Sequence, residues 1–476
     1  MNQSIIQNTG SFRDPMGHVY QSNAFGVAEA NQRIYRFISE EGCKQYEAIR
    51  SSIDDAVLEG YLTPSQELSK DNWPTKHLSN VAYVLEHQLI PYISYPYEWS
   101  FHYLKDAALH HLNFQLFLLK RNIVLRDASA FNIQFIGSKP LFIDLLSLAP
   151  YHQGDYWLGH HQFCEQFINP LLLRSTLGIS HNHWYRGRLE GVATSDLNRL
   201  LPLHKKFNWN IFIHVVLQNR LDIIAMKNQD KVIAKTKKQK GFSKLAYEEF
   251  LRQIKKWIHR LEPKNRGKTF WERYTHTHTY HPDELLKKKK FIADFAHKVK
   301  PQILVDLGCN RGEYSLLSLE HGAKYVIGFD FDQTVLDLAY HNAKKSSRFF
   351  LPLYLDASNP SPDQGWLQTE RCGFSKRTRP QALIALAFIH HLAIAKNVPL
   401  FQLIDWLVNI APQGIIEFIP KEDPTILNML SLREDIFVDY HQDVFESLLI
   451  THAKIVKQEK VSKSGRTLYW YDRNNA

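Results

Sequence analysis

The chain has 476 residues and carries 58 lysines and arginines against 48 aspartates and glutamates, a formal charge of +10. Its hydrophobic content of 44% is ample for packed cores, which excludes a mostly disordered or fibrous chain. Four scattered cysteines without a C-x-x-C pair exclude a disulfide framework, and no signal peptide or bilayer-length apolar stretch is visible, so we expect a cytoplasmic protein without membrane contact.

The N-terminal residues 1–225 form a first predicted domain. A helix-like stretch is followed by Ile123-Val-Leu-Arg-Asp-Ala-Ser-Ala-Phe-Asn-Ile-Gln-Phe135 and then by Pro140-Leu-Phe-Ile-Asp144. Asp127 and Asn132 have the spacing D-x-x-x-x-N, and Asp144 follows a short predicted hairpin. This segment resembles the catalytic loop and metal-binding aspartate of protein kinases and aminoglycoside phosphotransferases, which implies an α+β kinase-like domain.

The same segment departs from the kinase pattern at several points. Leu125 stands where the usual histidine precedes the catalytic aspartate, and residues 1–95 show neither a glycine-rich phosphate loop nor a convincing lysine. Phosphoryl transfer depends on such charge neutralisation, so we predict a non-catalytic domain. The alternative is that Asp127 and Asn132 only cap turns.

Positive charge gathers in the middle of the chain, where residues 226–295 form a predicted basic helical connector. Residues 227–300 contain 21 lysines and arginines against 8 acids, including the run Lys287–Lys290. Apolar spacing over residues 241–261 predicts an amphipathic helix. One interpretation is a polyanion-binding patch, and the other is a solvated connector between two domains.

Residues 296–476 alternate between strand and helix patterns. Apolar β-branched runs at residues 303–307, 325–329, 349–355, 382–388 and 414–419 predict five parallel strands. Two further runs, 453–461 and 466–471, flank Ser-Lys-Ser-Gly and predict a terminal antiparallel hairpin.

A glycine-containing loop, Val305-Asp-Leu-Gly-Cys-Asn-Arg-Gly312, follows the first of these strands and precedes a helix. Its glycines permit tight turning and close approach of a ligand to the helix N-terminus. Asp330 ends the second strand, where a carboxylate can accept ribose hydroxyls, and Asp356 ends the third.

This set resembles class I S-adenosylmethionine-dependent methyltransferases, with Asn310 where their loop most often has glycine. The resemblance implies a seven-stranded Rossmann-like α/β sheet in which an antiparallel strand lies between the fifth strand and its neighbour. It also implies S-adenosyl-L-methionine as the cofactor, bound by Asp306, Gly308, Asn310, Gly312, Asp330, Asp356 and Ala357. The alternative, a nicotinamide dinucleotide fold, has G-x-G-x-x-G spacing where this chain has G-x-x-x-G.

The methyl acceptor normally meets the cofactor beyond the fourth strand. That run ends in Phe388-Ile-His-His391, so His390 and His391 are the candidate catalytic residues, as a general base or as acceptor-positioning groups. The alternative is that neither histidine is catalytic: one is hydrogen-bonded within the scaffold and the other faces solvent. Glu417 and Lys421, near the end of the fifth strand, are further candidates, and local pairing explains them equally well.

The two halves together resemble a two-part bacterial family of S-adenosylmethionine-dependent methyltransferases that includes host-specific nodulation-type proteins. Matching stretches include Ser94-Tyr-Pro-Tyr-Glu-Trp-Ser100 and Gly465-Arg-Thr-Leu-Tyr469. The resemblance implies methyl transfer to an unidentified small molecule, protein or RNA, with the N-terminal domain recruiting or positioning it. The alternatives are a scaffold with a cofactor-sensing domain and a bifunctional phosphotransferase.

Histidines are abundant, and those at 276–281, 160–161 and 181–183 are candidate metal ligands. No cysteine or carboxylate cluster completes a coordination shell in the sequence, so we expect no native metal.

Overall fold

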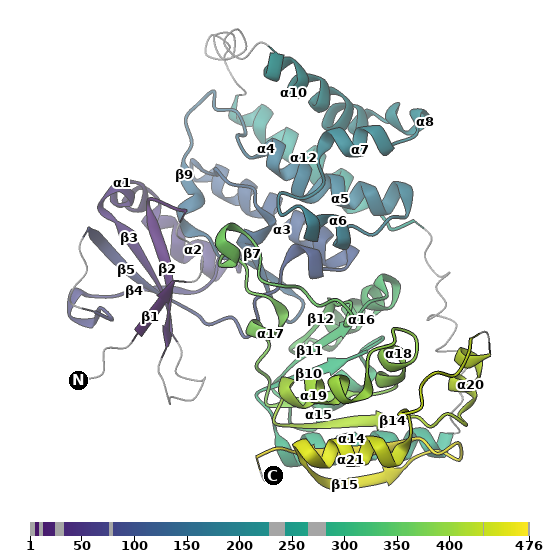
Figure 1. Cartoon of the computed structure of the whole chain (residues 1–476). Helices are drawn as coiled ribbons and strands as arrows, with labels where there is room; N and C mark the ends of the chain where they lie inside the picture. The colour runs from purple at the N-terminus through teal and green to yellow at the C-terminus, as the bar shows by residue number, and fades with distance from the viewer. Residues whose placement is uncertain are drawn as a thin grey trace. The chain divides into compact units, whose positions relative to one another are not determined.

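A computed structural model of the chain describes residues 5–8, 13–23, 33–75, 80–227, 243–264, 282–431 and 433–474. The chain divides into two compact units (Figure 1). The first unit comprises Met1–Phe135, Lys139–Asn265 and Asp363–Arg371, and the second comprises Ile136–Ser138, Arg266–Pro362 and Cys372–Ala476. No helix among the described residues is long and apolar enough to cross a membrane.

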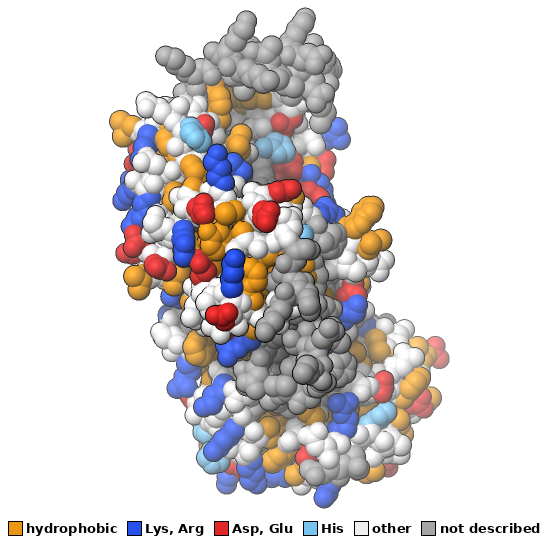
Figure 2. All heavy atoms as spheres, turned by 90° about the vertical axis from the view of Figure 1, so that its left-hand side faces the viewer, with side chains coloured by type: hydrophobic (Ala, Val, Ile, Leu, Met, Phe, Trp, Pro, Cys, Tyr) orange, Lys and Arg blue, Asp and Glu red, His pale blue; other side chains and the backbone are white. Residues whose placement is uncertain are grey.

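The first unit begins with a five-stranded antiparallel sheet in the order β1-β2-β3-β5-β4. The strands are β1 (Ile5–Asn8), β2 (Gly17–Asn23), β3 (Ile34–Ser39), β4 (Ser65–Glu67) and β5 (Val81–His87). Helices α1 (Glu40–Ile49) and α2 (Ile53–Leu58) follow β3, and the Ser39 hydroxyl caps α1 by accepting the N–H of Gly42. On the face that Figure 2 shows, the acidic and basic side chains of the described residues are interspersed and do not form separate patches.

The rest of the first unit is mainly helical and is centred on α3 (Phe101–Lys120), which is buried over most of its length. Short strands β6 (Ile123–Leu125), β7 (Ile133–Ile136), β8 (Lys139–Phe142) and β9 (Leu148–Pro150) follow α3. The remaining helical segments are α4 (His160–Phe163), η7 (Cys164–Ile168), α5 (Asn169–Leu172), η8 (Leu173–Leu177), α6 (Asn182–Gly187), α7 (Thr194–Leu200), α8 (Leu203–Lys206), α9 (Trp209–Ile211), η9 (Phe212–Leu217), α10 (Gln218–Lys227) and α12 (Lys244–Arg260).

Helix α12 is the amphipathic helix predicted over residues 241–261. It packs on α3, and the Gln115 amide donates a hydrogen bond to the Tyr247 hydroxyl at 2.9 Å. Leu251, Ile254 and Ile258 are buried, whereas Leu245 is exposed. The three-part domain division stays a prediction, and residues 228–242 and 265–281, with part of the basic patch and the histidines at 276–281, lie outside the described residues.

The second unit is built on a seven-stranded sheet in the order β12-β11-β10-β13-β14-β16-β15. Five strands run parallel, and β16 lies antiparallel between β14 and β15, which confirms the predicted strand arrangement. The strands are β10 (Ile303–Leu307), β11 (Tyr325–Asp330), β12 (Phe350–Tyr354), β13 (Ala382–Ala385), β14 (Gln413–Phe418), β15 (Lys454–Lys460) and β16 (Thr467–Asp472).

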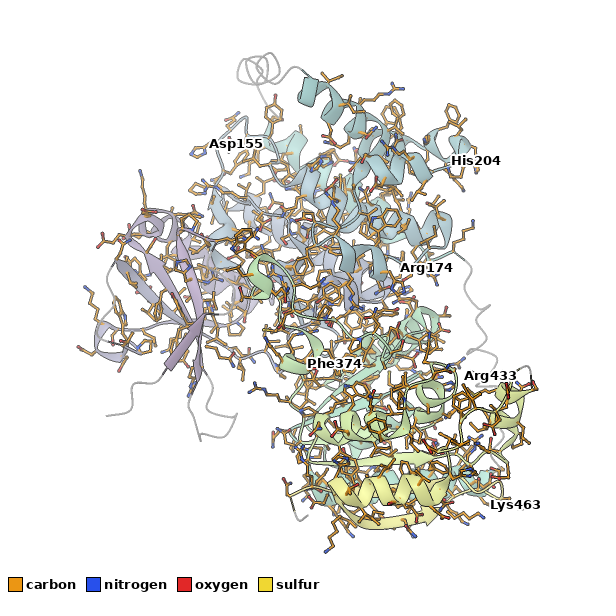
Figure 3. All side chains as sticks on the ribbon, viewed as in Figure 1. Asp155, Arg174, His204, Phe374, Arg433 and Lys463 are labelled. Carbon is orange, nitrogen blue, oxygen red and sulfur yellow. The ribbon has the colours of Figure 1, made fainter. Side chains whose placement is uncertain are left out.

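Both faces of this sheet are covered by helices. The helices are α14 (Pro282–Val299), α15 (Glu313–Glu320), α16 (Gln333–Ser346), α17 (Phe374–Arg377), α18 (Ile389–Ala393), α19 (Leu400–Ile410), α20 (Pro424–Leu430) and α21 (Gln442–His452). Alternation along β16 shows the two faces, because Trp470 packs edge-on against Phe295 of α14 while Tyr469 packs against Phe445 of α21. On the α17 side, Phe374, labelled in Figure 3, packs edge-on against Phe329 of β11.

Candidate functional site

The glycine loop joins β10 to α15, and its first residues are hydrogen-bonded to the neighbouring strand β11. The backbone N–H groups of Gly308 and Cys309 donate to the Phe329 carbonyl at 2.8 and 3.0 Å. Gly308, Asn310 and Gly312 all have positive φ, at 77°, 49° and 81°. Asparagine tolerates this left-handed region better than most residues, which explains why it can stand at a position where glycine is usual.

Asp330, at the end of β11, faces this loop. Its carboxylate accepts the N–H of Asn310 at 3.0 Å and the N–H of Asp332 at 3.0 Å. Burial raises the pKa of Asp330 to about 6. The residue expected at the cofactor ribose therefore also fixes the path of the glycine loop.

Asp306, at the end of β10, lies deeper, with an exposed fraction of 2%. Its carboxylate accepts a hydrogen bond of 2.6 Å from the Ser315 hydroxyl, which ties β10 to α15. Burial raises the pKa of Asp306 to about 7. Asp306 thus supports the loop from inside, and it is also one of the predicted cofactor residues.

Asp356 and Ala357 follow β12 and are both partly buried. The Asp356 carboxylate accepts the Ser358 N–H at 3.0 Å and its hydroxyl at 2.6 Å. Next to them, the Leu355 N–H donates to the Asp330 carbonyl at 2.9 Å. The candidate cofactor residues of β10, β11 and β12 therefore line the carboxyl edge of three adjacent parallel strands.

The candidate catalytic histidines do not lie on a strand. The predicted strand 382–388 ends at Ala385, because Ala387 turns the chain with φ 48°, and His390 and His391 lie on α18. The two rings have centroids 4.0 Å apart. His390 is fully buried, and neither of its ring nitrogens has a hydrogen-bond partner among the described residues.

Burial lowers the pKa of both histidines, that of His390 well below its usual range and that of His391 to about 4. Both rings are therefore neutral at neutral pH, and each has a nitrogen lone pair that can accept a hydrogen bond. A Cβ on Gly308 would lie 3.4 Å from the Phe388 ring, so the glycine loop and the turn before α18 meet. This meeting point lies between β10 and β13, where strand order reverses and where open α/β sheets bind ligands.

A buried ion pair supports the turn after β13. Lys288 of α14 and Glu417 of β14 are 2.7 Å apart, with exposed side-chain fractions of 4% and 0%. The same Glu417 oxygen accepts the Ala387 N–H at 2.7 Å. Sequence reasoning named Glu417 but missed Lys288, which it counted within a basic run, whereas Lys421 pairs with Asp435 nearer the surface.

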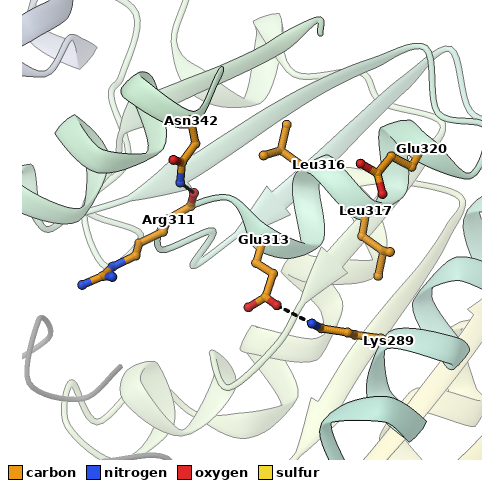
Figure 4. A pocket seen from close by; sticks show the side chains of 7 residues that line it. All are labelled: Lys289, Arg311, Glu313, Leu316, Leu317, Glu320 and Asn342. Atoms are coloured by element: carbon orange, nitrogen blue, oxygen red, sulfur yellow. Dashed lines mark hydrogen bonds and ion pairs between the residues drawn. The ribbon is translucent and has the colours of Figure 1, made fainter. Parts of the chain in front are cut away.

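A pocket of about 450 Å³ borders the glycine loop (Figure 4). Its lining includes Lys289 and Glu313, which form an ion pair of 2.6 Å, and Asn342, whose amide donates to the Arg311 carbonyl at 3.0 Å. None of the strand-end acids lines it, so this pocket is not the predicted cofactor site.

The acidic residues singled out in the first unit come together. The Asn132 amide donates to Asp127 at 2.9 Å and to Asp144 at 3.5 Å. Arg36 of β3, which sequence reasoning missed, donates to Asp144 at 3.1 Å and to the Ile143 carbonyl at 3.1 Å. Burial and the neighbouring Asp144 raise the pKa of Asp127.

No known family model matches the chain. Nodulation protein NoeA of Rhizobium meliloti (strain 1021) is 43% identical over 468 residues, which cover 98% of this chain and 96% of that protein.

Solved structures overlap with parts of the chain. The PH0226 protein of Pyrococcus horikoshii OT3 is 18% identical, covers 43% of this chain and 99% of its own, and has a TM-score of 0.31. WbdD is 16% identical over 46% of this chain and 47% of its own, with a TM-score of 0.30. The N-methyltransferase NodS of Bradyrhizobium japonicum WM9 is 9% identical over 40% of this chain and 97% of its own, with a TM-score of 0.30. These TM-scores are low, so the fold is assigned from the strand order of the sheet and not from the overlaps with solved structures.

The strand order, with the glycine loop and the Phe388 turn meeting at its reversal, defines a protein with a methyltransferase-like α/β fold. More particularly, the identity with NoeA over nearly its whole length shows that the chain belongs to the family of this nodulation protein, as its matching stretches predict.

Proposed function

We propose that the protein is an S-adenosylmethionine-dependent methyltransferase whose second unit binds the cofactor and carries the chemistry. The observation that carries this proposal is the meeting of the glycine loop with the Phe388 turn where strand order reverses, directly before the buried His390 of α18. The residues fit the cofactor, because a carboxylate at Asp330 and a backbone loop with three positive φ angles offer ribose acceptors and close backbone approach. The bound cofactor supplies an electrophilic methyl group on its sulfonium.

The chain's own residues hold the acceptor and take its proton. The neutral imidazole of His390 or His391 would accept a hydrogen bond from the acceptor, orient it toward the methyl group that a bound cofactor would supply, and take up the acceptor's proton. Glu417 acts as a positioning residue, since it holds the Ala387 N–H just before α18. Because Glu417 and the two histidines are held in place by the surrounding fold, they need no reorganisation when the methyl group is transferred.

We further propose that the first unit is a kinase-like scaffold that recruits or positions the acceptor. A five-stranded sheet, the Asp127–Asn132–Asp144 cluster and a cation on β3 support this proposal. Arg36 occupies the Asp144 carboxylate that would otherwise bind magnesium, which favours a binding role over phosphoryl transfer. Magnesium-dependent nucleotide binding that Asp144→Ala abolishes would instead favour the second candidate, a bifunctional phosphotransferase.

The experiment is transfer of tritiated methyl groups from labelled cofactor into a fractionated extract of the source cells. Wild-type protein should label one fraction of RNA, protein or small molecules. His390→Gln should lower the rate of methyl transfer about 100-fold or more while cofactor binding persists. The control is His321→Gln, at a turn histidine whose ring is hydrogen-bonded to the Leu317 carbonyl, and this variant should keep the wild-type rate. Cofactor binding without label in any fraction would favour the alternative, a cofactor-sensing scaffold, and equal rates for both variants would remove His390 from the mechanism.

A further inference from the structure

A second cluster of chemically reactive side chains lies in the first unit, away from the acids described above. His160, Cys164 and His214 each offer one ligand atom, and these atoms all lie within 4.8 Å of one another. His160 Nε2 is 3.0 Å from His214 Nδ1, and Cys164 Sγ is 3.5 Å from His160 Nε2. Cys164 and His214 are buried, with exposed fractions of 0% and 3%.

Two helical segments bring these side chains together. His160 and Cys164 are four residues apart, on one face of the continuous helix α4–η7. His214 comes from η9. Both η7 and η9 are π-helical, as is η8, and this wider turn is rare and frequently found at functional sites. The helix geometry therefore departs from the ordinary α form at the segments that carry Cys164 and His214.

Aromatic rings enclose the cluster. The His214 ring stacks on Trp257 with centroids 5.4 Å apart, and the His160 ring packs against Trp157 at 5.5 Å and Phe250 at 5.4 Å. Polar groups in such a dry shell are costly unless each has a strong partner. A hydrogen bond between the two imidazoles satisfies one nitrogen of each, and the thiol, a weak donor, adds little at 3.5 Å.

The distances fit a tetrahedral metal centre. Zinc–nitrogen bonds of about 2.05 Å and zinc–sulfur bonds of about 2.3 Å give ligand separations of roughly 3.3 Å for N···N and 3.6 Å for N···S. The observed 3.0 and 3.5 Å lie near these values. We propose that His160, Cys164 and His214 bind a zinc-type divalent ion, with the fourth position open, and so join η7 to η9. Two imidazoles and one thiol favour such a borderline-soft ion over magnesium or calcium.

The protonation states suit this ligand set. Burial lowers the pKa of His160 to about 4 and that of His214 to about 3, so both rings are neutral at pH 7 and have lone pairs to donate. Burial raises the pKa of the Cys164 thiol, so a metal ion must displace its proton to solvent, and each ion bound as thiolate releases one proton. Sequence reasoning expected no metal because it paired His160 with His161 and saw neither Cys164 nor His214 beside them.

The test is titration of the full-length, EDTA-treated protein with Co²⁺, followed by metal analysis of protein produced with zinc. We expect near-stoichiometric cobalt binding with a near-ultraviolet thiolate charge-transfer band, and one proton released per ion. Cys164→Ala and His214→Gln should abolish the band, whereas the matched controls Cys43→Ala and His161→Gln should retain it.

Absence of the charge-transfer band from the wild-type protein under excess cobalt would overturn the proposal, whether or not any variant folds. A band that survives Cys164→Ala would also overturn it, since the thiolate would then come from elsewhere. Circular dichroism of each variant, and protection of Cys164 from alkylation in the metal-loaded wild type, separate loss of a ligand from loss of structure.

Discussion

The ion pair between Lys288 and Glu417 makes a large effect on stability testable by one substitution. Lys288→Met keeps most of the aliphatic volume but leaves the Glu417 carboxylate, with 0% side-chain exposure, without its cation. Removing one partner of a buried pair typically costs about 3–5 kcal/mol, because the remaining charge is desolvated and uncompensated. For a unit of this size, that corresponds to a melting temperature lower by roughly 6–20 °C.

The neighbouring lysine provides a matched control within the same basic run. Lys289 also forms an ion pair, with Glu313 at 2.6 Å, but the exposed fractions of those side chains are 42% and 61%. Water and salt screen such a pair, so Lys289→Met should cost less than about 1 kcal/mol. Both variants remove one lysine charge, so the difference between their losses of stability reports the effect of burial.

The assay is alkylation of Cys309, a buried cysteine of the second unit, measured by peptide mass spectrometry across a urea series. Because Cys309 reacts when the second unit opens, its labelling reports the unfolding free energy of that unit alone. Equal unfolding curves for Lys288→Met and Lys289→Met would refute the reasoning. A Lys288→Met/Glu417→Leu double variant should recover much of the loss, because no charge then stays buried.

Three further predictions concern pH and the glycine loop. Burial places the pKa of Asp330 at about 6, and only its ionised form accepts both ribose hydroxyls. Calorimetric affinity for S-adenosylmethionine should therefore weaken about tenfold or more from pH 7 to pH 5, and this pH dependence should become smaller in Asp330→Asn. Gly312→Ala should lower the unfolding free energy by about 1–3 kcal/mol in denaturant titration, because φ is +81° and the new methyl group overlaps the Phe350 ring, whereas Gly187→Ala meets no neighbouring atom. Burial lowers the pKa of His111 to about 3, below its unfolded value, so its contribution to stability is present above about pH 6.5 and is lost as pH falls. At pH 5, His111→Phe should therefore raise the unfolding free energy by about 2 kcal/mol relative to the wild type. An acid-unfolding curve that His111→Phe leaves unchanged would count against this assignment.

Much of the second unit was predictable because its strands are buried on both faces and read as continuous apolar runs. Ile303–Leu307 matches the prediction residue for residue, and the terminal hairpin places β16 beside β14. The end of β13 was wrong by three residues, since the apolar run continues into α18 and only the positive φ of Ala387 marks the break. Apolar content alone does not separate a buried strand from the buried helix that follows it.

The missed residues share one cause, which is that their partners lie far away in the chain. Lys288 appeared as one member of a solvated run, although Glu417 lies 129 positions later. Arg36 pairs with Asp144 across 108 positions, and His214 meets His160 across 54. Spacing rules read neighbours on one helix or strand, so contacts made only by packing leave no local pattern. The polyanion contact predicted for residues 227–300 stays a prediction.

The proposed function depends on binding of S-adenosylmethionine by the second unit, through the glycine loop and the strand-end acids. Isothermal titration calorimetry of the full-length protein measures this binding. We expect saturable, near-stoichiometric binding by the wild type and loss of binding in Asp330→Ala. Lys289→Met, which lies outside the predicted cofactor residues, should still bind. No heat of binding by a folded wild type, or undiminished affinity in Asp330→Ala, would contradict it.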